Sequence, residues 1–215
     1  MTAKMLATID RMSGGRLIAG VGAGWNEAEF NALGVPFQER GARINEYLRI
    51  WQACWAPGKV SFAGKFVTFA DMHVSPKPQQ QPCPPIWVGG LSDAALRRAA
   101  RFAAVWQPTP TPLADLLERQ QSLQKACVRI GRQHPPETRM SFRIEFSQIT
   151  GDAPPSGAER LIGHGTPSEV AADLRRYRET AGVSAFQINF HGKRDLGQLL
   201  DSMDCFVQEV KPRVT

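Results

Sequence analysis

The sequence is poor in the residues that build metal clusters and disulfide frameworks. Its 215 residues include four cysteines and four histidines, all scattered and without a C-x-x-C pair, so we expect reduced thiols and no metal site. No window approaches the roughly 18 consecutive apolar residues of a membrane span. The first twenty residues also lack the apolar core and cleavage site of a signal peptide. These absences exclude a membrane protein and a disulfide-rich secreted domain, and they predict a cytoplasmic protein.

The charge is moderately positive, with 26 Lys and Arg against 20 Asp and Glu. The arginines are spread over several segments at helical spacing, and no aromatic residues interleave with them, so the sequence predicts no nucleic-acid partner. Hydrophobic residues make up 42% of the chain, charged residues make up 21%, and no long biased tract occurs. This composition predicts one folded domain over residues 1–215.

Short apolar runs alternate with longer stretches at helical spacing, which is typical of βα units and a parallel sheet. The strands are expected at residues 17–22, 86–90, 105–106, 140–149 and 185–190, and the helices at 3–12, 44–55, 93–102, 113–130, 167–181 and 196–210. A small antiparallel hairpin is expected at residues 60–69. The first helix has Met5, Ile9 and Met12 on one side. Five parallel strands fit either an open doubly wound sheet or a piece of an eight-stranded barrel.

Two glycine-rich segments are the main candidate sites. Gly20-Val21-Gly22-Ala23-Gly24-Trp25 leaves the first strand, but it fails the G-x-G-x-x-G fingerprint, so its glycines serve either close packing or close approach of a ligand. Gly89-Gly90-Leu91-Ser92-Asp93 joins a strand to a helix N-terminus. The free N–H groups there favour an anion such as phosphate, although Ser92 or Asp93 also suits a simple helix cap.

Three weaker candidates complete the list. Gly163-His164-Gly165-Thr166 precedes a helix, and a capping box formed by Thr166 and Glu169 explains it without a ligand. His191 follows the last strand, where it could face a site, although a lone histidine in a loop is more often exposed or packed. A turn-rich loop is expected at residues 151–157. Trp25, Trp87 and Trp106 lie at or near strand ends, where they suit either core packing or stacking on a flat cofactor.

The order and spacing of many short motifs resemble the bacterial luciferase-like family of flavin- and deazaflavin-dependent oxidoreductases. The motifs are Ser13-Gly14-Gly15-Arg16-Leu17-Ile18, Gly20-Val21-Gly22-Ala23-Gly24-Trp25, Leu33-Gly34-Val35-Pro36-Phe37, Glu39-Arg40-Gly41, Pro84-Pro85-Ile86-Trp87-Val88-Gly89-Gly90, Ala94-Ala95-Leu96-Arg97-Arg98-Ala99-Ala100 and Gly165-Thr166-Pro167. The resemblance covers nearly the whole chain.

This resemblance implies a (β/α)8 barrel with reduced FMN or the deazaflavin coenzyme F420 at the C-terminal ends of its strands. The cofactor phosphate would bind at Gly89, Gly90, Leu91 and Ser92, and the ring would border Gly22, Ala23, Gly24 and Trp25. The implied activity is the reduction or oxygenation of a small organic substrate. Some deazaflavin relatives carry a Gly-Glu pair where this chain has Gly24-Trp25, so the resemblance names no catalytic residue.

Members of this family carry about three βα units before the helix expected at residues 3–12. The resemblance therefore implies a partial barrel, with five of eight parallel strands and an inserted hairpin. Unpaired parallel edges and an uncovered apolar interior favour association, so we expect a homo-oligomer or a partner chain that completes the barrel. A non-catalytic remnant or subunit that keeps the phosphate-binding turn is the alternative to an active enzyme.

Overall fold

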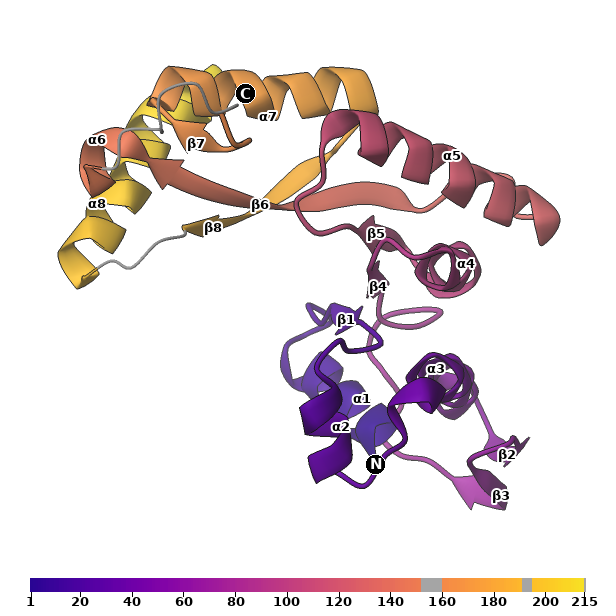
Figure 1. The fold of residues 1–215 in the computed structure, drawn as a ribbon. Helices are drawn as coiled ribbons and strands as arrows, with labels where there is room; N and C mark the ends of the chain where they lie inside the picture. Colours follow the sequence, from indigo (N-terminus) through magenta and orange to yellow (C-terminus); the bar gives the residue numbers. More distant parts are fainter. Residues whose placement is uncertain (152–159, 191–194, 215) are drawn as a thin grey trace. The chain divides into compact units, whose positions relative to one another are not determined.

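The computed structural model describes residues 1–151, 160–190 and 195–214 (Figure 1). The expected loop at residues 151–157 therefore lies, beyond Gly151, outside the described residues, and so does His191. The chain forms two compact units. The first contains Met1–Trp106 and Leu123–Pro136, and the second contains Gln107–Ser122 and Glu137–Thr215.

The first unit contains three strands of the main sheet in the order β1-β4-β5, four complete α-helices and a separate hairpin. Strand β1 pairs in parallel with β4, whereas β2 and β3 form the antiparallel hairpin that the sequence predicted. Figure 1 shows this hairpin beside α3. The elements are α1 (Thr2–Met12), β1 (Ala19–Val21), α2 (Glu27–Ala32), the 3-10 turn η1 (Phe37–Glu39), α3 (Arg40–Trp55), β2 (Lys59–Ala63), β3 (Thr68–His73), β4 (Ile86–Gly89), α4 (Asp93–Phe102) and β5 (Val105–Gln107), whose last residue belongs to the second unit.

The second unit is built around the long strand β6, which pairs in parallel with both β7 and β8. One face of β6 is apolar and lies toward α7 (Figure 1), where Phe142 contacts the rings of Tyr177 and Phe186. The elements are α5 (Leu113–Arg129), which contributes to both units, β6 (Glu137–Phe146), α6 (Ser147–Thr150), β7 (His164–Gly165), α7 (Pro167–Ala181), β8 (Ala185–Phe190), α8 (Leu196–Cys205), the π turn η2 (Phe206–Val210) and the 3-10 turn η3 (Lys211–Arg213).

All five predicted strands and the hairpin are present. The last strand has its predicted ends at residues 185 and 190, whereas the other strands and the hairpin have at least one shifted end. The strand predicted at residues 140–149 runs from 137 to 146, because the chain turns into α6 at Ser147. The first predicted strand shortens to Ala19–Val21. The structure adds α2 and the two-residue strand β7, neither of which the sequence predicted.

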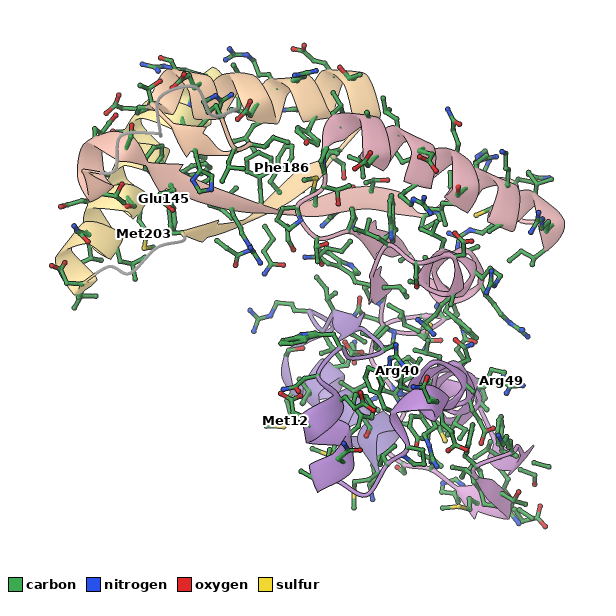
Figure 2. All side chains as sticks on the ribbon, in the orientation of Figure 1. Met12, Arg40, Arg49, Glu145, Phe186 and Met203 are labelled. Atoms are coloured by element: carbon green, nitrogen blue, oxygen red, sulfur yellow. The ribbon has the colours of Figure 1, made fainter. Side chains whose placement is uncertain are left out.

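Helix α1 buries the side opposite its long apolar residues. Its buried residues are Ala3, Ala7 and Asp10, whereas Met5, Ile9 and Met12 are 55%, 47% and 83% exposed. The small side chain of Ala3 allows close approach of α3, and the Trp55 Nε1–H donates to the Ala3 carbonyl at 2.9 Å. Figure 2 labels Met12 at the end of α1.

A buried carboxylate holds the hairpin turn against α3. Glu46 is only 2% exposed, and its carboxylate accepts hydrogen bonds from the backbone N–H groups of Lys65, Phe66 and Val67 at 2.8–2.9 Å. A Cβ atom at Gly64 would lie 2.4 Å from Glu46 Cδ. Burial acts to raise the pKa of Glu46, but the three hydrogen bonds outweigh it and the pKa is lowered.

The four cysteines are free thiols, and burial raises the pKa of Cys54, Cys83 and Cys127. Within the described residues, no three His, Cys, Asp or Glu side chains gather as metal ligands would. In the same part of the chain, each helix is too short or too polar to span a bilayer.

Candidate cofactor site

The two candidate glycine segments leave the sheet side by side. Strands β1 and β4 are parallel neighbours, with Ala19 opposite Ile86, Gly20 opposite Trp87 and Val21 opposite Val88. The segment Gly22–Trp25 follows β1, and the segment Gly89–Ser92 includes the end of β4. The fold therefore brings both segments to the carboxyl ends of two adjacent strands, which is where α/β proteins hold their ligands.

One face of this strand pair carries glycines beside a single large side chain, that of Trp87. Ala19, Ile86 and Val88 are 3%, 2% and 0% exposed on the buried face. Because side chains alternate along a strand, Gly20 and Gly22 lie on the opposite face. A Cβ atom at either glycine would meet no atom within 4 Å. The space directly above these two glycines is therefore open, and the half-buried Trp87 lies opposite Gly20 on the same face.

Gly24 has a different role, because packing accounts for it. Its φ is +85°, a conformation that other residues rarely adopt. A Cβ atom there would lie 2.7 Å from the ring of Phe30. The Phe30 ring in turn packs edge-on against Phe37, with centroids 5.3 Å apart. Trp25, the next residue, is 86% exposed.

The turn between β4 and α4 combines a helix cap with the geometry of an anion site. The Ser92 hydroxyl accepts a hydrogen bond from the Ala95 N–H at 3.3 Å, so the cap interpretation is confirmed for Ser92. Gly90 has a φ of +106°, and a Cβ atom there would lie 3.0 Å from Ala95 Cβ. The other first-turn N–H groups lack intrahelical acceptors, as at any helix start. The side chain of Asp93 is exposed.

Trp106 fixes this turn from the core. Its side chain is fully buried, which excludes stacking on a ligand and makes core packing its role. The Trp106 Nε1–H donates to the Gly90 carbonyl at 2.9 Å. The sequence placed Trp106 at a strand end, but it gave no sign of this hydrogen bond.

A second fixed point lies where the chain enters both strands. Asp10 is fully buried, and its carboxylate accepts from the backbone N–H groups of Gln79 and Gln80 at 2.7 and 2.9 Å. The Gln80 side-chain amide donates to Asp10 at 2.7 Å and to the Leu17 carbonyl at 2.8 Å. Burial acts to raise the pKa of Asp10, but these hydrogen bonds lower it overall. Leu17 lies in the segment before β1, and Gln80 lies in the segment before β4. The hydrogen bonds of Asp10 and Gln80 therefore fix the positions of the segments that lead into both strands.

The structure shows the capping box predicted at Thr166. The Thr166 hydroxyl accepts from the Glu169 N–H at 3.3 Å, and the Glu169 carboxylate accepts from the Thr166 N–H at 2.8 Å. Upstream, the Gly163 N–H donates to the Asp173 carboxylate at 2.9 Å. These contacts account for the Gly163–Thr166 motif through packing and capping alone.

The second unit has a polar face on strand β6 that was not predicted from the sequence. Gln107 Nε2 donates to Ser141 Oγ at 3.1 Å and also to Gln187. Glu145, four residues after Ser141 on β6, pairs with His164 on β7. The Glu145 Oε2 and His164 Nδ1 atoms are 3.7 Å apart. The alternation of polar and apolar residues over 137–146 is the signal that predicts such a face. The eight candidate cofactor residues, by contrast, all belong to the first unit.

A pocket of about 550 Å³ lies elsewhere in the first unit. Its walls are mainly apolar residues of α3, the hairpin and the start of α1, such as Trp51 and Phe69. None of the residues in the two glycine segments lines it. Size and lining alone do not connect this pocket with the glycine turns.

Comparison with known proteins decides the family. Residues 1–154 match the luciferase-like monooxygenase family. The chain belongs to this family. The resemblance carried by the glycine motifs is thus confirmed. The FMNH2-dependent dimethylsulfone monooxygenase of Pseudomonas putida is 42% identical over 106 residues, which are 48% of this chain and 29% of that protein. The chain therefore spans less than a third of this luciferase-like relative.

Solved luciferase-like structures confirm the fold class, an α/β fold that forms part of a (β/α)8 barrel with an inserted hairpin. A monooxygenase from Streptomyces bottropensis matches with a TM-score of 0.80 at 23% identity. An F420-dependent secondary alcohol dehydrogenase, solved with an F420–acetone adduct, also matches with a TM-score of 0.80, at 17% identity. Each match covers 100% of this chain and 74% of the other.

Proposed function

We propose that this chain forms the cofactor-binding part of an oxidoreductase that uses reduced FMN or F420 to reduce or oxygenate a small organic substrate. The observation that carries the proposal is the parallel β1–β4 register, which brings both glycine segments to one end of adjacent strands. Family membership supports the choice of cofactor class. The 42% identical relative favours FMN, and the fold is also shared with an F420-dependent enzyme.

The residues of the site fit such a cofactor. Gly90 and the N-terminal turn of α4 would hold the phosphate through backbone N–H groups, assisted by the helix dipole. Leu91 and Ser92 complete that turn, with the Ser92 hydroxyl already engaged as the helix cap. The open face at Gly22 would lie against the ring, because no side chain fills that space.

Gly89, Ala23, Gly24 and Trp25 have supporting positions in the proposed site. Gly89 ends β4 and leads into the phosphate turn. Gly24 allows the loop to fold over Phe30, which holds Ala23 and the exposed Trp25 next to the ring position. When bound, the cofactor supplies the hydride or the oxygen activation, whereas these residues orient it.

A matched pair of substitutions at the N-cap tests the phosphate assignment. Asn and Asp cap helices as well as Ser does, so Ser92→Asn and Ser92→Asp both preserve α4. Only Ser92→Asp places a negative charge beside the phosphate. We expect FMN or F420 titrations, followed by fluorescence, to give a Kd within about threefold of wild type for Ser92→Asn and at least about tenfold weaker for Ser92→Asp.

If Ser92→Asn and Ser92→Asp bind the cofactor equally well, the cofactor phosphate does not bind at this turn. Turnover then separates an active enzyme from a subunit that only binds cofactor. The assay supplies the protein with reduced cofactor and with a panel of small organosulfur compounds, ketones and alcohols. An active enzyme should show oxygen consumption or cofactor oxidation whose rate depends on the added substrate. Cofactor binding without any turnover would favour the non-catalytic subunit.

A further inference from the structure

Arg98 is a buried cation with neutral partners only. Arg98 is only 4% exposed. Its neighbour on the arginine-rich helix α4, Arg97, is exposed. Arg98 Nε donates to Asn45 Oδ1 at 2.7 Å, and Nη2 donates to the Gly41 carbonyl at 3.2 Å. Within the described residues no carboxylate forms an ion pair with it. Burial accordingly lowers the pKa of Arg98, while the group stays charged at neutral pH.

A buried charge without a counter-charge is costly. Arg98 lies six residues after Ser92, which corresponds to about 9 Å along the helix axis. Side chains on a helix generally tilt toward its N-terminus, a direction that would bring the guanidinium nearer to the Gly89–Ser92 turn than its Cα is. A dianionic group bound at that turn would lie within the range of its field.

The same guanidinium also joins the two glycine segments through packed groups. Gly41 lies in the first turn of α3, next to Arg40, which is labelled in Figure 2. The Arg40 guanidinium stacks 3.7 Å from the centroid of the Phe37 ring. Phe37 packs on Phe30, whose ring closes against Gly24. Arg98 thus fixes α4, which begins at the phosphate turn, against α3, whose start carries the packing of the other segment.

We propose that Arg98 is a positioning residue that tunes the site for a phosphate-bearing cofactor tail. It holds the N-terminal turn of α4 against α3, and its uncompensated charge strengthens binding of an anion at that turn. The inference rests on the proposed function, since it concerns the phosphate of the same cofactor. It goes further by stating that selectivity for the phosphorylated form depends on a side chain that does not touch the ligand.

The experiment measures discrimination between ligands with and without phosphate. FMN and riboflavin share one ring system, as do F420 and its deazaflavin chromophore without the phosphate-bearing tail. Arg98→Met removes the charge and keeps an apolar side chain of moderate size. We expect it to weaken FMN binding by about 5- to 20-fold, the effect of one charge at this separation in a partly screened site. Riboflavin binding should change by less than about twofold.

Three further variants keep the test sharp. Arg97→Met removes an exposed charge one residue away on the same helix and should leave both Kd values within about twofold. Arg98→Lys keeps the charge but loses the forked hydrogen bonds, so it should lower the thermal midpoint while retaining most of the preference for FMN. Arg98→Gln is a second neutral variant, for use if Arg98→Met does not fold, and it should lose the preference.

The ratio of the riboflavin and FMN Kd values decides the outcome. Equal weakening of both ligands by the neutral variants would mean that Arg98 is only structural, which overturns the inference. A preference for FMN that survives in Arg98→Met or Arg98→Gln would overturn it as well. If the wild-type chain binds neither FMN nor F420, the proposed function itself fails, a result that is visible before any variant is made.

Discussion

Replacement of Asp10 tests how the entry to both site strands is held. The carboxylate accepts three hydrogen bonds from Gln79 and Gln80, and the Gln80 amide also bonds to the Leu17 carbonyl. In Asp10→Asn one oxygen becomes an NH2 group. This donor would face either the two backbone N–H groups or the Gln80 amide, so at least one buried hydrogen bond is lost.

The expected cost follows from that geometry. A hydrogen bond to a charged group contributes about 1.5–3 kcal/mol, and a buried donor left without a partner costs about 1–3 kcal/mol. These two costs overlap, because the unpaired donor is a consequence of the lost bond, so Asp10→Asn should lower the free energy of unfolding by about 2–3 kcal/mol. Asp10→Ala, which strands two backbone N–H groups, should cost more.

The assay is urea denaturation followed by tryptophan fluorescence. All five tryptophans lie within Met1–Trp106, so this signal reports on the first unit. The folded-state pKa of Asp10 is lowered, so its stabilisation is present above the unfolded-state value of about 3.9 and is lost as the pH falls through the lower folded value. Wild type should therefore lose stability below about pH 4 more steeply than Asp10→Asn does.

Glu27→Gln is the matched acid-to-amide control, because Glu27 is exposed on α2. It should change the free energy of unfolding by less than about 1 kcal/mol, since it affects only the interaction with the helix dipole. If Asp10→Asn is as stable as this control, or if its stability depends on acid in the same way as wild type, the account of Asp10 is wrong.

Four further predictions follow from the same structure. Gly90→Ala should destabilise the chain by about 1–3 kcal/mol, because φ is +106° and the new Cβ would press on Ala95; an unchanged thermal midpoint would contradict the geometry. Glu46→Gln should reduce stability at neutral pH but flatten the loss that wild type shows below about pH 4.5, since the pKa of Glu46 is lowered; parallel pH profiles of the two proteins would count against this. Trp106→Phe should lower the free energy of unfolding by about 1 kcal/mol through loss of the bond to Gly90 and should also weaken FMN binding; unaltered binding would separate Trp106 from the site. Light scattering after size-exclusion chromatography should show an oligomer or a complex with a partner chain, because apolar side chains of α1 are exposed, and a stable, well-ordered monomer would refute that expectation.

The sequence predicted most elements because their hydrophobic periods are regular. Strand β6 shows this clearly, since Met140, Phe142, Ile144 and Phe146 are each at most 1% exposed in strict alternation. Helix α2 was missed because it has only six residues and buries none of them. Its one local signal was a cap, in which the Asn26 side chain accepts from the Ala28 N–H.

The sequence predicted the two glycine turns of the candidate site, but it did not predict the buried residues that hold these turns in place. Glycine patterns mark Gly22 and Gly90 without any knowledge of tertiary contacts. Asp10 and Arg98, however, look like ordinary solvated charges on helices, and only the folded chain shows them buried. Their partners are 53 to 70 residues away in sequence, a separation over which local patterns carry no information.

The hydrogen bond between Trp106 and Gly90 also determines how a peptide plane is oriented. In a trans peptide the C=O and N–H point in opposite directions. Because the Gly90 oxygen is tied to a fully buried indole, the Leu91 N–H on the same plane must point away from that indole. If the proposed phosphate binds at this turn, it would meet a Leu91 N–H whose orientation the Trp106–Gly90 hydrogen bond has already fixed.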